Sequence, residues 1–299
     1  MERMDFNTFK SWAAENIIAH MPSEYEGAKV QVHKVDKPGA PYTGLMVIKK
    51  GQTVVPNVNL EMMYEMYSDG APAKKIMEDM AEIAAMEPPV PIKPAFYLDD
   101  YEAVKDRICL RLINLEANAE LLKNVPHRVI EDMALTYIVV MDIGGDDLWS
   151  SMVTNEIAAE WGASEDGLCS DALKNSAILF PPRLDTMNSL MGKEPEEGGE
   201  PGLMVLSCKG GFFGACAILY PGVLNMAYEE IGEDLYIIPS SVNEVILVPK
   251  ALVDDPVRLL LTHRFVSSQT APAERLSSRI FFYDHNTRRF KNAVPEAVS

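Results

Sequence analysis

The stretch DLYIIPSSVNEVILVPK, residues 234–250, sets two apolar runs on either side of a proline and two serines. Each run has the length and the Ile and Val content of a β-strand. Ser241 and Glu244 show the S-x-x-E spacing of a capping box, in which the hydroxyl and the carboxylate bind free backbone N–H groups. We therefore expect two strands joined by a one-turn cap or a bend.

A catalytic serine is the alternative interpretation of the same stretch. A serine nucleophile needs a base within hydrogen-bond reach, and the hydrolase turn that presents it carries the pattern GxSxG. Here the two serines stand between Pro239 and Val242, and residues 234–250 contain no glycine. We prefer the turn, because it accounts for every residue of the stretch.

Strand-length runs joined by turn residues recur outward from this hairpin. They occupy residues 28–35, 42–50, 52–60, 128–142, 147–154, 203–208, 212–220, 279–285 and 288–291. Helical spacing of apolar residues marks 7–20, 60–70, 71–86, 154–162, 164–180, 221–232 and 255–269. Because tight turns join the strands and no regular βαβ alternation appears, we predict an α+β fold with largely antiparallel sheets, helices packed on one face and a hairpin-helix-hairpin organisation.

We place a domain boundary after Asn124. Residues 1–124 would form an α+β subdomain of a helix, a three-strand meander and helices. Its segment 95–114 has the pattern of a helical turn that leads into a strand, which could return to the first sheet. Residues 125–299 would form a second α+β subdomain. Within it, residues 192–202 hold four glycines and four glutamates and no apolar residue, which predicts a flexible acidic loop.

Composition indicates a soluble globular protein. Hydrophobic residues make up 47% of the chain, yet no segment approaches the roughly 20 apolar residues of a membrane helix. The first residues are acidic and amphipathic, unlike a signal peptide. The four cysteines lie far apart without a CxxC pair, so we expect reduced thiols, a cytoplasmic location and no membrane association.

The formal net charge of −17 is unevenly distributed. Residues 251–299 hold seven Lys or Arg and five Asp or Glu, so this part carries +2 and the first 250 residues carry −19. Nucleic-acid binding requires a basic footprint, so we expect no direct binding of nucleic acid. The local exception is a set of arginines that are candidates for binding a phosphate or an acidic partner: Arg275, Arg279, Arg288 and Arg289. The alternative is solvated arginines on a closing hairpin.

The loop NVPHRVIED, residues 124–132, most resembles a catalytic loop. In the functional interpretation, the His127 imidazole serves as an acid or base, Arg128 binds a carboxylate or phosphate, and Glu131 and Asp132 tune both. The alternative is a structural turn in which Arg128 pairs with Glu131 or Asp132. The five histidines are scattered singly, so we predict no metal site, and no pattern indicates a cofactor.

Five segments in this order resemble a bacterial family of unknown function from anaerobic Firmicutes, DUF5688. They are LLKNVPHRVIEDMALTYIVV, AILFPPRL, FGACAILYPGVL, DLYIIPSSVNEVILVPK and APAERLSSRIFFYDHNTRRF. The resemblance extends over nearly the whole chain and includes FKSWAAENI near its start. It implies a bacterial cytoplasmic protein and brings with it no catalytic residue, ligand or cofactor.

Three functional hypotheses follow. The first is a non-enzymatic protein-interaction or regulatory protein, which we prefer because no catalytic pattern outweighs its structural alternative. The second is an enzyme, hydrolase-like, with its site near the His127–Arg128 loop. The third is an acidic mimic of nucleic acid. The sequence leaves the oligomeric state open.

Overall fold

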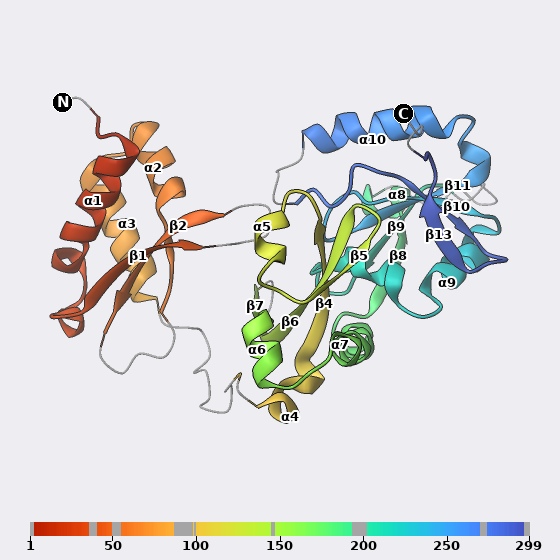
Figure 1. Ribbon diagram of the computed structural model, residues 1–299. Helices are drawn as coiled ribbons and strands as arrows, with labels where there is room; N and C mark the ends of the chain where they lie inside the picture. The colour runs from red at the N-terminus through yellow and green to blue at the C-terminus, as the bar shows by residue number, and fades with distance from the viewer. Residues whose placement is uncertain are drawn as a thin grey trace. The chain divides into compact units, whose positions relative to one another are not determined.

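The chain folds into two compact units, Met1–Ala95 and Phe96–Ser299. The computed structural model describes residues 3–35, 41–49, 55–86, 98, 100–144, 147–192, 202–269 and 274–295 (Figure 1). The division falls earlier than the boundary that we placed after Asn124. The reason is the strand β4, Ile108–Asn114, which pairs along its whole length with β6, Met133–Gly144, of the second unit. This strand does not return to the first sheet.

The first unit is a three-stranded antiparallel sheet with helices and its own core. Its strands, in the order β1-β2-β3, are Lys29–Val35, Tyr42–Ile48 and Val58–Asn59. Its helices are α1 Phe6–Asn16, η1 Ile17–His20, η2 Ser23–Tyr25, α2 Leu60–Ser68 and α3 Ala73–Ala85. The buried side chains come from all of the longer elements and include Phe9, Leu45, Leu60, Met77 and Met80. The α3 methionines Met77 and Met80 therefore serve as core.

The second unit contains two antiparallel sheets. One has the strand order β4-β6-β5, with β7 also paired to β6, and the other has the order β13-β12-β10-β11-β9-β8. The further strands are β5 His127–Ile130, β7 Asp147–Met152, β8 Pro182–Thr186, β9 Met204–Cys208, β10 Leu235–Ile238, β11 Val245–Pro249, β12 Phe281–Asp284 and β13 Arg289–Asn292. With the first unit, these sheets confirm the predicted α+β fold with antiparallel strands.

Helices flank both sheets of this unit. They are α4 Tyr101–Val104, η3 Lys105–Arg107, α5 Ala119–Leu122, α6 Asn155–Glu160, α7 Glu165–Leu179, α8 Met187–Leu190, η4 Gly214–Leu219, α9 Val223–Ile231, η5 Lys250–Leu252 and α10 Pro256–Ser268. Ser164 and Thr154 cap α7 and α6 through their hydroxyl oxygens. Helix α7 also covers the edge of β4, because Ser176 Oγ accepts from the Leu110 N–H at 2.8 Å.

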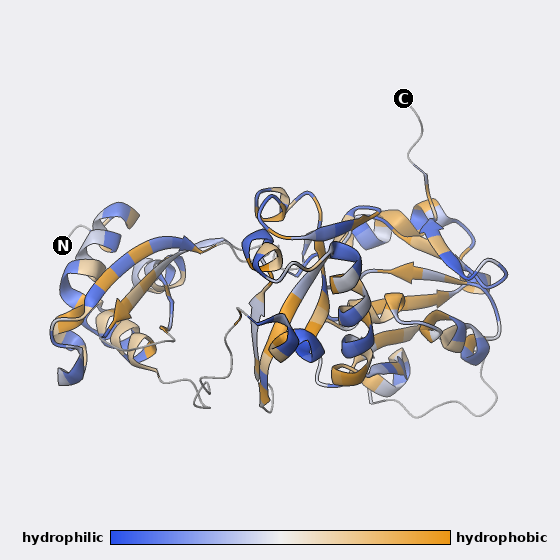
Figure 2. Ribbon diagram, turned by 60° about the horizontal axis from the view of Figure 1, so that its bottom comes forward, coloured by the Kyte–Doolittle hydropathy of each residue, from blue (hydrophilic) through white to orange (hydrophobic). Residues whose placement is uncertain are grey.

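One large core joins the two sheets of the second unit. Its side chains come from β4 and β6 of one sheet, from β9 to β12 of the other, and from the helices α7, η4 and α9. Figure 2 shows the strands of this unit coloured mainly as hydrophobic. A smaller core lies on the opposite face of the six-stranded sheet, where Leu260 of α10 packs with Tyr236, Val248 and Ile280.

We predicted a strand over residues 212–220, paired in a hairpin, but this segment does not form a strand. It contains η4, and β9 pairs instead with β8 and β11. Gly214 explains the difference, because a Cβ atom there would lie 2.1 Å from the Asn243 carbonyl oxygen and 2.7 Å from the Cys208 nitrogen. The chain therefore turns tightly against the β10–β11 loop rather than extending beside β9.

The opening hairpin is confirmed: β10 and β11 pair antiparallel from Leu235↔Pro249 to Ile238↔Ile246. No helix starts in the connection. The Ser241 hydroxyl accepts from the Asn243 N–H at 3.1 Å, and the Ser240 hydroxyl donates to Glu244 at 3.3 Å. Both serines thus serve the turn. Of the predicted acidic loop 192–202, residues 193–201 lie outside the described part of the chain.

Candidate functional site

Arg128 lies on β5 and forms ion pairs with the first turn of α7. Its Nε lies 2.7 Å from both carboxylate oxygens of Glu165, and a terminal nitrogen donates to Asp166. The buried Tyr137 hydroxyl donates to the same Glu165 carboxylate. The hydrogen bond from Arg128 holds the pKa of Glu165 below its usual value, although burial opposes this. Burial and the Glu165 carboxylate raise the pKa of Tyr137.

These partners differ from those that the structural alternative gave to Arg128. The structural alternative paired it with Glu131 or Asp132, whereas the actual carboxylates come from α7. His127 is half-buried, and its Nδ1 donates to the Val125 carbonyl at 3.0 Å. Arg128 therefore fastens α7 to the β5–β6 hairpin.

Glu131 and Asp132 form the turn of this hairpin and bind a different segment. Glu131 accepts from Arg279 at 3.1 Å. Asp132 accepts from the Ser277 hydroxyl at 2.6 Å and from the Ser278 N–H at 2.9 Å. The four candidate residues of the loop thus separate into an Arg128 network and an Asp132 network, and the structure does not bring them together around one reacting position.

The Asp132 network extends to α10. The buried His263 donates from Nε2 to the Ser277 carbonyl at 3.0 Å, and Arg264 donates to the Ser278 carbonyl at 3.1 Å. Asp132 therefore holds the segment on which α10 rests. Burial lowers the pKa of His263, although the Ser277 carbonyl and Asp132 favour its charged form.

This lowered pKa predicts how stability depends on pH. The unfolded chain protonates His263 as the pH falls below about 6.5, whereas in the folded chain His263 stays neutral until a lower pH. Stability should therefore fall as pH falls below about 6.5, by at most about 1.4 kcal/mol per pH unit for this one proton. Urea unfolding between pH 5 and 7 measures the slope. His263→Gln should reduce it, and an unchanged slope in this variant would assign it to other groups.

The outer face of α10 carries an exposed apolar stripe, which we define as Val257, Leu261 and Phe265. Their side chains are 49%, 59% and 71% exposed, and the spacing of i, i+4 and i+8 places them on one face. Figure 1 shows α10 lying along one side of the second unit. The helical spacing was visible in the sequence, but nothing there indicated which apolar residues would face outward.

The four arginines of the predicted anion site do not form one group. Arg275 donates to the Ser268 carbonyl at 2.7 Å, and Arg279 pairs with Glu131. Arg288 and Arg289 instead line a cavity of about 470 Å³ between the start of α9 and the β12–β13 hairpin. In the described part of the chain, neither of these two forms an ion pair.

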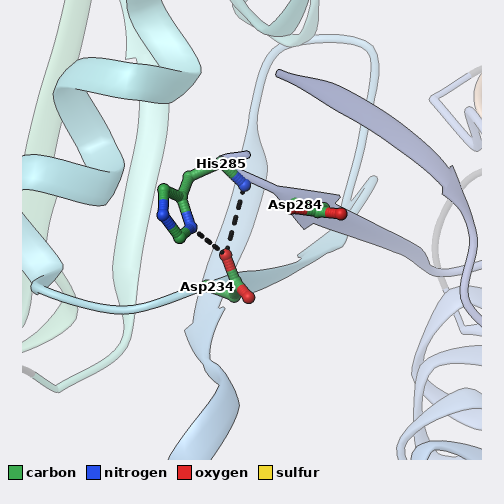
Figure 3. Close-up of side chains that lie close together, drawn as sticks. All are labelled: Asp234, Asp284 and His285. Atoms are coloured by element: carbon green, nitrogen blue, oxygen red, sulfur yellow. Dashed lines mark hydrogen bonds and ion pairs between the residues drawn. The ribbon is translucent and has the colours of Figure 1, made fainter. Parts of the chain in front are cut away.

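The β12–β13 hairpin also brings Asp234, Asp284 and His285 within 4.8 Å of one another. His285 donates to Asp234 from Nδ1 at 2.9 Å and from its backbone N–H at 3.2 Å (Figure 3). The His285 ring stacks on Tyr228. Asp284 accepts from the Asn286 N–H at 2.9 Å, and its side chain points away from the other two. These hydrogen bonds stabilise the turn between β12 and β13. The absence of a metal site stays a prediction.

The structure thus defines a two-unit α+β protein with an exposed apolar helix face and an arginine-lined cavity. Among the described residues, no helix is long and apolar enough to span a membrane. The chain belongs to the family of unknown function DUF5688, whose model matches residues 6–285 and so includes both units. No curated protein and no solved structure matches the chain.

Proposed function

We propose that this chain is a non-enzymatic protein-interaction protein whose α10 docks a partner helix. The observation that carries the proposal is the stripe Val257, Leu261 and Phe265, which is exposed over its whole length. Single exposed apolar residues are normal on a protein surface. Three on successive turns of one helix form a contiguous apolar surface, which is typical of an interaction site. Their spacing matches the anchors of helix-to-helix recognition.

The charge around the stripe favours an acidic partner. Helix α10 contains Arg258 and Arg264 and no acidic residue, although the chain as a whole carries −17. Complementary potentials steer association and suppress wrong partners. We therefore propose a partner that presents an amphipathic helix with acidic residues beside its apolar positions.

The opposite face of α10 is fixed, which favours binding. Leu260 is buried in the small core and His263 is bound to Ser277. A surface that is already ordered loses little conformational entropy when a partner binds. The hydrogen bonds of Asp132 with Ser277 and Ser278 hold in place the segment to which α10 is bound.

The enzyme hypothesis has less support, because Arg128, Glu131 and Asp132 are each engaged in bonds that hold elements together. No observation favours the mimic of nucleic acid over the interaction protein. We retain a bacterial origin, a cytoplasmic location and the absence of direct nucleic-acid binding as parts of this proposal.

Photo-crosslinking tests the docking face directly. Benzoylphenylalanine would replace Leu261 or Phe265 in the full chain, within cells that naturally contain the protein. Ile178 on α7 is the matched control, because it is 66% exposed and lies outside the stripe. We expect the same adduct from both stripe positions and none from Ile178, with the label on an acidic amphipathic helix of the partner. No adduct above the Ile178 level would overturn the proposal, and an adduct with a second copy of this chain would replace the acidic partner by self-association.

The identified partner then allows a quantitative test. Phe265→Ser should weaken binding about 30-fold, which corresponds to the roughly 2 kcal/mol of a central anchor residue. Arg258→Glu should slow association with the acidic helix. Ile178→Ser should bind like the wild type, and all three variants should melt like it, since the replaced side chains are exposed. Equal affinities for Phe265→Ser and Ile178→Ser would contradict the assignment of the stripe.

A further inference from the structure

We infer that the cavity between α9 and the β12–β13 hairpin binds a small organic phosphate that carries a planar ring. This inference is independent of the docking function of α10. The cavity has a volume of about 470 Å³, within the roughly 300 to 1,000 Å³ typical of small-molecule sites. We name it the arginine pocket.

Aromatic side chains form part of its wall. Tyr220, Tyr283 and Phe290 line the pocket, and Tyr220 and Tyr283 are only 4% and 2% exposed. Phe290 in turn packs edge-on against Phe281 of the core. Phe290 is half-buried, so its ring is the one that offers an ordered apolar surface to a planar ligand at little entropic cost, and the two buried tyrosines lie in the wall beside it.

Arg288 and Arg289 supply the positive charge. They are consecutive, both are exposed at the pocket, and neither forms an ion pair with any described carboxylate. Two guanidinium groups without an ion pair at one cavity can together bind an anionic ligand. Arginine binds phosphate oxygens in a bidentate manner, and two arginines match the double charge of a phosphate monoester.

The start of α9 adds backbone donors on the other side. Gly222 is the N-cap residue and has no side chain to bind the free N–H groups of the first turn. Leu224 and Asn225 of that turn line the pocket. The Asn225 side chain is bound to Glu229 at 2.7 Å, so this turn contributes its backbone N–H groups and the positive end of the helix dipole.

Arg288 occupies a backbone conformation that favours glycine. Its φ angle is +52°, in the left-handed region, where a residue with a Cβ costs about 1 kcal/mol more than glycine. Glu131 and Phe213 share this conformation, so the conformation supports the inference only together with the position of Arg288 at the pocket. A ligand bound by the Arg288 guanidinium group accounts for an arginine at this position.

Titration calorimetry of the full chain with phenyl phosphate tests the inference. We expect saturable binding that is tighter than that of inorganic phosphate, which lacks the ring. Arg288→Gly should weaken it about tenfold, the loss of one charge-assisted interaction, and Arg289→Gln should do the same. Arg288→Gly should melt at or above the wild-type temperature, because it relieves the left-handed conformation, so weaker binding cannot be ascribed to unfolding. Lys174→Gln, on α7, is the matched control and should bind like the wild type, because Lys174 is exposed and does not line the pocket.

Several outcomes would overturn the inference. Equal affinity for phenyl phosphate in the wild type and in both pocket variants would place binding elsewhere. The absence of saturable binding would remove the site altogether. Tighter binding of phenylacetate than of phenyl phosphate would exclude phosphate as the ligand class. Because crosslinking at Phe265 does not involve this pocket, either proposal can fail without the other.

Discussion

Gly214→Ala should destabilise the unit Phe96–Ser299 by about 3 kcal/mol or more, which is the upper range for overpacking a close-packed interior. The added Cβ would lie 2.1 Å from the Asn243 oxygen, 2.7 Å from the Cys208 nitrogen and 2.8 Å from Ser207 Cα. All three are backbone atoms, so no side-chain rotation relieves the contact. Either η4 or the β10–β11 loop must move, and both border the main core.

Urea unfolding of the full chain measures this loss. Gly202→Ala is the matched control, because its Cβ would meet nothing within 4 Å and its φ angle is not left-handed. The first unit has a separate core, so its own unfolding transition should stay unchanged in both variants. A midpoint for Gly214→Ala equal to that of Gly202→Ala would show that the close approach is relieved at little cost.

Asp132→Ala should destabilise the same unit by about 2 to 3 kcal/mol, because it leaves charge-assisted hydrogen bonds of partly buried groups unmade. The carboxylate accepts at 2.6 Å from the Ser277 hydroxyl, and at 2.9 Å and 3.3 Å from the N–H and hydroxyl of Ser278. His263 of α10 rests on the Ser277 carbonyl. The substitution should therefore also weaken the packing of α10 on the segment that contains Ser277.

Hydrogen exchange resolves this effect along the chain. We expect faster exchange of α10 amides in Asp132→Ala, together with an earlier urea midpoint. Glu131→Ala is the control from the same turn, and it should cost under about 1 kcal/mol, as expected for one ion pair near the surface. Equal losses in the two variants would show that the Asp132 bonds are not specific. Unchanged exchange of the α10 amides would show that Asp132 does not stabilise α10.

The sequence predicted those features that depend on neighbouring residues. The β10–β11 hairpin follows from two apolar runs around Pro239 and Ser240, and the starts of α6 and α7 follow from the cap residues Thr154 and Ser164. Gly232 ends α9 in the left-handed conformation that glycine adopts readily. Each of these signals lies within a few residues of the structure it determines.

Features that depend on distant residues were not predictable. The partners of Arg128 are Glu165 and Asp166, on a helix that follows 37 residues later, whereas the predicted partners lay three and four residues away. Residues 212–220 have the composition of a strand, yet the close approach of Asn243 to Gly214 excludes one. Of the candidate residues of the β5–β6 hairpin, Glu131 and Asp132 lie on its turn, whereas His127 and Arg128 belong to β5. Their bonds depend on which segments the fold places beside the hairpin.

The six-stranded sheet is open, and its two edge strands are β8 and β13. Unpaired backbone groups on such edges recruit strands of other molecules unless charges or prolines discourage it. Strand β8 begins at Pro182 and carries Arg183 and Asp185, and β13 carries the exposed Arg289 and Lys291. We therefore expect Arg289 to have a second role, which is to oppose association of β13 with strands of other molecules at high protein concentration. Neutralising it should lower solubility before it lowers stability, so variants of this strand are best compared in dilute solution, with light scattering to detect aggregation.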